Sequence, residues 1–134
     1  MTIEGLITIA SSFATQDTLA RLENEIAAFG LTVFARIDHA AGAAAAGLVL
    51  RPTVVVIFGN AKGGTALMQI TQTIGIDLPL KMLVHEDGGG KTWLSYNDSR
   101  WLAARHGIID APMTEKLAVM LSQIAFNATQ HDPR

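Results

Sequence analysis

Apolar residues recur along the chain in short runs whose spacing alternates between that of strands and that of helices. Residues 5–10, GLITIA, have the β-branched composition of a strand. The next segment places Leu19, Leu22 and Ile26 on one helical stripe, and residues 31–37 alternate with the period of a half-buried strand. The beginning of the chain therefore predicts a strand, an amphipathic helix and a second strand, in this order.

The middle of the chain contains an alanine run followed by a strongly apolar segment. Residues 41–47, AGAAAAG, have glycines near both ends of the run, which suits a short helix packed closely against a neighbouring backbone. A low-complexity linker is the alternative interpretation. Residues 53–58, TVVVIF, are apolar on both faces and mostly β-branched, which predicts a central strand covered on both sides.

A glycine-rich stretch, FGNAKGGT at residues 58–65, joins this strand to a helix-like pattern in residues 67–74, with Thr65 as the expected N-cap. A Walker phosphate loop is excluded because Lys62 precedes the glycine pair, and the spaced glycines of a dinucleotide fingerprint are missing. Backbone amides at such a turn can bind an anion or a carboxylate. The alternative is a turn that only lets the backbone pack closely. The candidate ligand-binding residues are Asn60, Lys62, Gly63, Gly64 and Thr65.

Two strand-like runs in the second half of the chain, residues 80–87 and 91–96, flank three glycines and predict a β-hairpin. A short helix follows with His106 in its last turn and Gly107 as its stop, and a longer helix begins near Thr114. In total the pattern predicts about five strands and several helices in a single α+β domain, residues 1–134.

The composition and net charge restrict the kinds of molecule that the protein can be expected to bind. Apolar residues make up 49% of the 134 residues and charged residues 16%, an apolar excess that predicts a subunit interface. The net charge is −2 without a basic stripe, which argues against nucleic acid and against anionic membranes as partners. The absence of cysteine excludes disulfides and thiolate metal ligands.

The start of the chain and its apolar runs predict a cytoplasmic location. Glu4 stands where a signal peptide would carry basic residues, and the apolar patch after it is short. Arg51 divides the longest apolar segment, residues 40–58, before it reaches the roughly 18 residues that a membrane-spanning helix needs.

The residues able to carry acid–base or metal chemistry stand at predicted strand and helix ends, where functional side chains often lie. If His39, Glu86 and His106 converge, they could bind a divalent metal such as zinc, or act as a general acid–base set. The alternative is that they cap helix ends, bond backbone donors or emerge into water, and Tyr96 then serves as a core aromatic. The candidate polar cluster comprises His39, Glu86, Asp87, Tyr96 and His106.

Four segments, taken together in this order, resemble the family known as domain of unknown function 302. They are IDHAAGAAAAGLVLRPTVVVIFGNAKGGTALMQ, DLPLKMLVHED, WLSYND and LAARHG. The chain departs from the family pattern at Ala61, where proline is expected, and at His85, where an aromatic residue is commoner. The resemblance implies a TATA-binding-protein-like α+β fold, in which an antiparallel sheet carries helices, and homodimers in some members. It implies no established reaction.

Three classes of function follow. The first is a homodimeric module that binds or senses a small anionic ligand near the glycine-rich stretch, favoured by the apolar composition and the few acid–base groups. The second is an enzyme with the His39, Glu86 and His106 site, whose reaction the sequence does not specify. The third is a structural or assembly role without a ligand.

Overall fold

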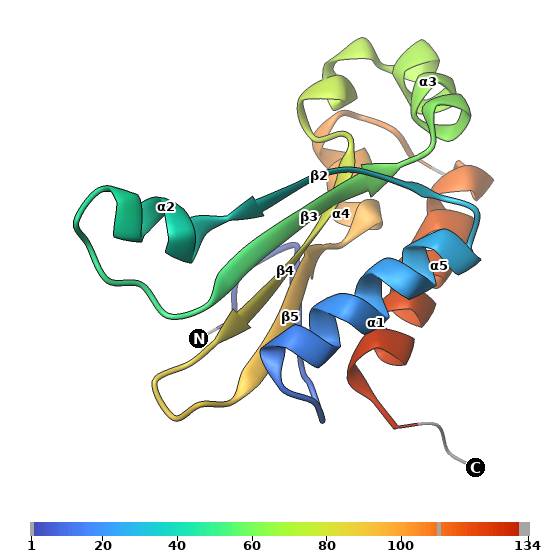
Figure 1. Ribbon diagram of the computed structural model, residues 1–134. Helices are drawn as coiled ribbons and strands as arrows, with labels where there is room; N and C mark the ends of the chain where they lie inside the picture. The colour runs from blue at the N-terminus through green and yellow to red at the C-terminus, as the bar shows by residue number, and fades with distance from the viewer. Residues whose placement is uncertain (1, 110, 132–134) are drawn as a thin grey trace.

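The computed structural model describes residues 2–109 and 111–131. Its strands form one antiparallel sheet in the order β1-β5-β4-β3-β2 (Figure 1). This arrangement confirms the predicted α+β class and the hairpin, which is the β4–β5 pair. The strands are β1 (Leu6–Ala10), β2 (Thr32–Asp38), β3 (Thr53–Gly59), β4 (Leu80–Glu86) and β5 (Thr92–Asn97).

Two long helices, α1 (Thr15–Ala28) and α5 (Pro112–Thr129), lie side by side against one face of the sheet. The core forms where the apolar stripes of both helices meet alternate residues of the strands, since side chains on one face of a strand recur every second position. Its fully buried members include Leu22, Ile26, Val56, Phe58, Met82, Val84, Leu94 and Ile124.

The opposite face of the sheet is only partly buried, and we call it the open face; Val55, Ile57, Leu83 and Trp93 belong to it. Burial alternates along β3, with the side chain of Phe58 buried against the helices. This corrects the prediction that the β3 segment is covered on both sides. The apolar residues of both faces misled the sequence argument, because a sheet can leave one apolar face uncovered.

The alanine run forms α2 (His39–Ala45), which projects from one end of the sheet in Figure 1. The Asp38 carboxylate caps it by accepting a hydrogen bond from the amide of Ala41 at 2.9 Å. The helix is confirmed, but its close packing is not, because no residue of α2 is buried and a Cβ on Gly42 would meet nothing within 4 Å. Apolar side chains around α2 are exposed, and a homodimer would cover such a surface. The homodimer stays a prediction. The exposed side chains are Ile37, Leu48, Val49 and Leu50.

The other end of the sheet carries α3 (Ala61–Ile70), the 3₁₀ helix η1 (Gln72–Ile76) and α4 (Ser99–Arg105). Strands β3 and β5 both run antiparallel to β4, so they point the same way. Their carboxyl ends therefore both lie at this end of the sheet. A second, smaller core forms here, and Leu117 of α5 packs against both cores. The buried residues of the smaller core are Leu67, Ile74, Ala103 and Ile108.

Candidate functional site

The glycine-rich stretch is the beginning of α3. Asn60 is the N-cap, and its side-chain oxygen accepts hydrogen bonds from the amides of Lys62 at 2.8 Å and Gly63 at 3.3 Å. This corrects the prediction of Thr65 as N-cap, since Thr65 and both glycines lie within the helix. The glycine pair suggested a turn because glycine disfavours helices, but the strong capping preference of asparagine wins at this position.

A cavity of about 660 Å³ lies between α3 and α5. The loop from Leu78 to Leu80 completes its walls, together with Leu31 and Phe34 from the region of the outer strand β2. Apolar side chains dominate the lining, and Met113, Leu117 and Met120 of α5 are among them. All of the predicted ligand-binding residues are part of the lining, namely Asn60, Lys62, Gly63, Gly64 and Thr65.

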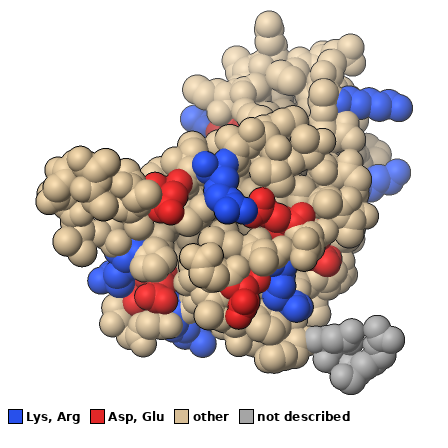
Figure 2. Space-filling model, viewed as in Figure 1, with Lys and Arg blue, Asp and Glu red and all other residues tan. Residues whose placement is uncertain are grey.

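The charged residues that line this cavity are both basic. Lys62 of α3 and Lys116 of α5 both line it, and among the described lining residues there is no aspartate or glutamate. In Figure 2, basic side chains extend outward at the right margin of the molecule, on the side where α3 and α5 lie in Figure 1. The described lining is therefore mostly apolar, and its charged residues are both lysines.

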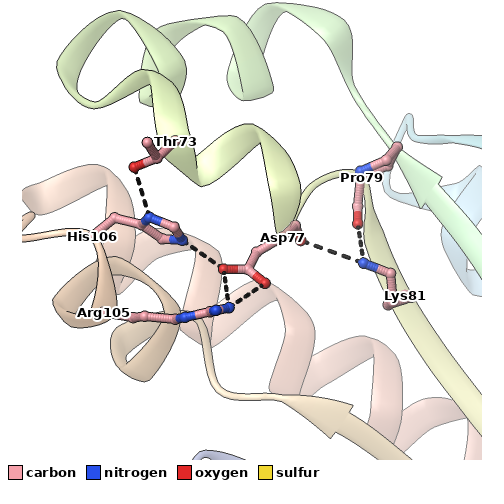
Figure 3. Close-up of polar contacts among 6 residues, drawn as sticks. All are labelled: Thr73, Asp77, Pro79, Lys81, Arg105 and His106. Atoms are coloured by element: carbon pink, nitrogen blue, oxygen red, sulfur yellow. Dashed lines mark hydrogen bonds and ion pairs between the residues drawn. The ribbon is translucent and has the colours of Figure 1, made fainter.

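A polar cluster next to the cavity ties η1 to α4; we call it the Asp77 clasp, formed by Thr73, Asp77, Arg105 and His106 (Figure 3). His106 Nε2 lies 2.6 Å from Asp77 Oδ2, and Arg105 lies 3.0 Å from both carboxylate oxygens. Because a carboxylate only accepts, Nε2 carries the proton, and in the neutral ring Nδ1 accepts from the Thr73 hydroxyl at 2.9 Å. Both nitrogens of His106 are therefore engaged.

The structure does not bring His39, Glu86 and His106 together. His39 begins α2 after β2, and Glu86 ends β4. Both residues therefore lie at the end of the sheet opposite to the one that carries α4 and His106. Within residues 2–109 and 111–131, no group of three His, Asp or Glu side chains is placed to hold a metal ion. This corrects the hypothesis of convergence. The carboxylate beside His106 is Asp77, because α4 begins after β5 at the same end of the sheet as η1.

Asp87 and Tyr96, the other members of the candidate polar cluster, have structural roles. Asp87 accepts hydrogen bonds from the Trp93 indole at 2.9 Å and from the amides of Gly89 and Lys91, which closes the hairpin loop. The indole hydrogen bond and these amides hold the pKa of Asp87 below its usual value. Tyr96 belongs to the main core, where burial raises the pKa of its phenol.

A hydrogen-bonded chain on the open face escaped the sequence analysis. His85 Nε2 lies 2.9 Å from the Ser95 hydroxyl, which lies 2.8 Å from the hydroxyl of Thr8. Burial lowers the pKa of His85, although the nearby Asp87 opposes this effect. The two-residue period of the hairpin could have indicated that His85 and Ser95 share a face. No sequence signal indicated Asp77, which meets His106 across 29 positions of the chain.

A five-stranded antiparallel sheet backed by two helices, with a cavity at one edge, defines a small α+β protein. The family described as "Domain of unknown function DUF302" matches residues 7–124, and the chain belongs to this family. The crystal structure of an uncharacterized conserved protein DUF302 from Bacillus stearothermophilus has the same fold. Its TM-score is 0.81 at 18% identity, over 94% of this chain and 99% of that one.

Three curated relatives carry the name of a fluoride channel. Fluoride-specific ion channel FluC 1 of Brucella suis biovar 1 is 49% identical over 104 residues, which is 78% of this chain and 41% of that protein. FluC 2 of Brucella melitensis biotype 1 matches equally over 38% of its length. The chain thus spans about two fifths of the length of these relatives. In the part of the chain that the structure describes, no helix is long and apolar enough to cross a membrane.

Proposed function

We propose that this chain is a binding module whose small-molecule ligand occupies the cavity between α3 and α5. The observation that carries the proposal is the cavity itself. Its volume of about 660 Å³ falls within the range of about 300–1,000 Å³ that is usual for ligand sites. Its lining is mostly apolar with a few polar groups, as ligand sites usually are.

The geometry favours binding over the enzymatic alternative. His106 and Asp77 form an acid–base pair, but only 8% of the His106 side chain is exposed. Thr73 and Asp77 hold both of its ring nitrogens, and none of these three residues is among those that line the cavity, so the pair stands apart from the proposed ligand site.

A second candidate is a role in fluoride handling, supported by the names of the curated relatives and by 49% identity to them. Under this candidate, Lys62 at the edge of the cavity would contribute positive charge near a bound fluoride ion. Titration with sodium fluoride, with sodium chloride as the matched salt, tests it through spectral changes that only fluoride should cause.

The principal proposal is tested by filling the cavity. A Cβ on Gly64 would lie 3.8 Å from Leu78 Cδ1 and 3.9 Å from Met68 Cε, and both of these side chains line the cavity. We expect the fluorescent anion 8-anilinonaphthalene-1-sulfonate to bind the wild type, and Gly64→Phe to weaken its binding at least about tenfold, because the phenyl ring takes its place.

The matched control is Gly42→Phe in α2, where an added Cβ meets nothing within 4 Å. This variant should bind the probe like the wild type. Circular dichroism establishes that both variants are folded. A folded Gly64→Phe protein that binds the probe as tightly as the wild type would contradict the proposal.

A further inference from the structure

The two lysines among the lining residues belong to the two helices that flank the cavity. Lys62 belongs to the first turn of α3 and Lys116 to the beginning of α5, and both residues are exposed. Leu67, also part of the lining, is buried. The lining therefore combines two exposed lysines with an apolar, partly buried interior.

We infer that the ligand is an amphipathic monocarboxylate, with an apolar body in the cavity and its carboxylate at Lys62 and Lys116. The inference rests on the proposed function and specifies its ligand. Burial of the apolar body in the cavity supplies most of the affinity. Ammonium groups at the edge can meet a carboxylate that remains partly hydrated, whereas moving that charge into the apolar interior would be costly.

The carboxylate is bound by side chains rather than by the amino end of α3. The side-chain oxygen of Asn60 already accepts from the amides of Lys62 and Gly63, and the Asn60 carbonyl accepts from the amide of Gly64 at 2.9 Å. These three of the first four amides of α3 have no donor left for an external anion, so the lysine side chains are the main donors. A small inorganic anion would gain only the lysines and would leave the apolar interior unused.

Titration calorimetry with three probes tests this ligand class: octanoate, 1-octanol and inorganic phosphate. Octanoate should bind about tenfold more tightly than 1-octanol, because a charge-assisted contact adds to the same apolar burial. Phosphate should bind more weakly than either. In the double variant Lys62→Met, Lys116→Met, octanoate should lose this advantage while the binding of 1-octanol is unchanged. Lys91→Met, in the hairpin loop at the opposite end of β5, is the matched control and should change nothing.

The outcomes separate this inference from the proposed function. If octanoate and 1-octanol bind equally, and Gly64→Phe abolishes both, the cavity binds ligands but the carboxylate inference is overturned. Phosphate binding as tight as that of octanoate would overturn it as well, in favour of a simple anion site. If neither octanoate, 1-octanol nor the fluorescent anion binds the wild type, the proposed function fails together with the inference.

Discussion

Phe58→Ala is expected to lower the free energy of unfolding by about 3–5 kcal/mol. Phe58 lies in β3, next to the centre of the sheet, and its ring is fully buried against the helices. The substitution removes the transfer free energy of the ring and leaves a cavity that a close-packed core fills only in part. Since domains are typically stable by about 5–15 kcal/mol, this loss is a large fraction of the total.

Urea unfolding followed by circular dichroism measures the effect, with Phe126→Ala as the matched control. Phe126 lies on α5 with 49% of its surface exposed, so its replacement removes much less buried area than that of the fully buried Phe58. We expect Phe126→Ala to change the free energy of unfolding by no more than about 1 kcal/mol. Equal losses in the two variants would contradict the assignment of the main core.

Asp77→Ala is expected to cost about 2 kcal/mol and to loosen η1 and α3 more than the sheet. It leaves His106 Nε2, on a side chain that is 8% exposed, without its acceptor. Arg105 also loses its partner, but this side chain is half exposed and its ion pair contributes less. Hydrogen exchange should accelerate most at the amides of residues 61–76, because the Asp77 clasp fixes the end of this segment to α4.

Arg100→Ala serves as the control for the Asp77 clasp, because it breaks an ion pair of α4, the helix that also carries Arg105. Arg100 binds the Glu115 carboxylate through two hydrogen bonds, of 2.8 and 2.6 Å, in an exposed pair. Exposed pairs contribute at most about 1 kcal/mol, so stability should hardly change. If Arg100→Ala and Asp77→Ala have the same effect on stability and exchange, the Asp77 clasp does not anchor η1.

The Asp77 clasp and the cavity share one wall. Gly75 and Leu78 line the cavity on either side of Asp77 in the sequence. The contacts of Asp77 to α4 therefore help to hold the position of this wall. We expect loss of the clasp to weaken binding of the probe in proportion to the local loosening, which connects the second prediction to the proposed function.

Local patterns predicted those parts of the fold that depend on neighbouring residues. The alternation of side chains in two runs around three glycines was enough to predict the β4–β5 hairpin. The stripe that includes Leu22 and Ile26 was enough to predict the buried side of α1. The start of α3 was missed because the sequence argument gave the glycine pair more weight than the cap at Asn60. Propensity and capping act in opposite directions there, and the balance depends on context.

The candidate site was predicted in part. The residues from Asn60 to Thr65 all line the cavity, since a helix that begins directly after a strand has its first turn at the end of the sheet. That they bind an anion stays a prediction. The apolar walls could not be predicted, because they come from α5 and from the loop before β4, far along the chain. The partner of His106 was missed for the same reason, since only tertiary packing brings Asp77 to it.

The most direct test of the central claim, that the cavity between α3 and α5 binds a small molecule, is to locate the bound probe. Backbone amide NMR spectra recorded during titration with 8-anilinonaphthalene-1-sulfonate provide this location. We predict that the shifts change most in residues 60–68, 78–80 and 113–120, which include most of the cavity lining. Changes confined to the open face or to α2, with these three segments unaffected, would contradict the claim.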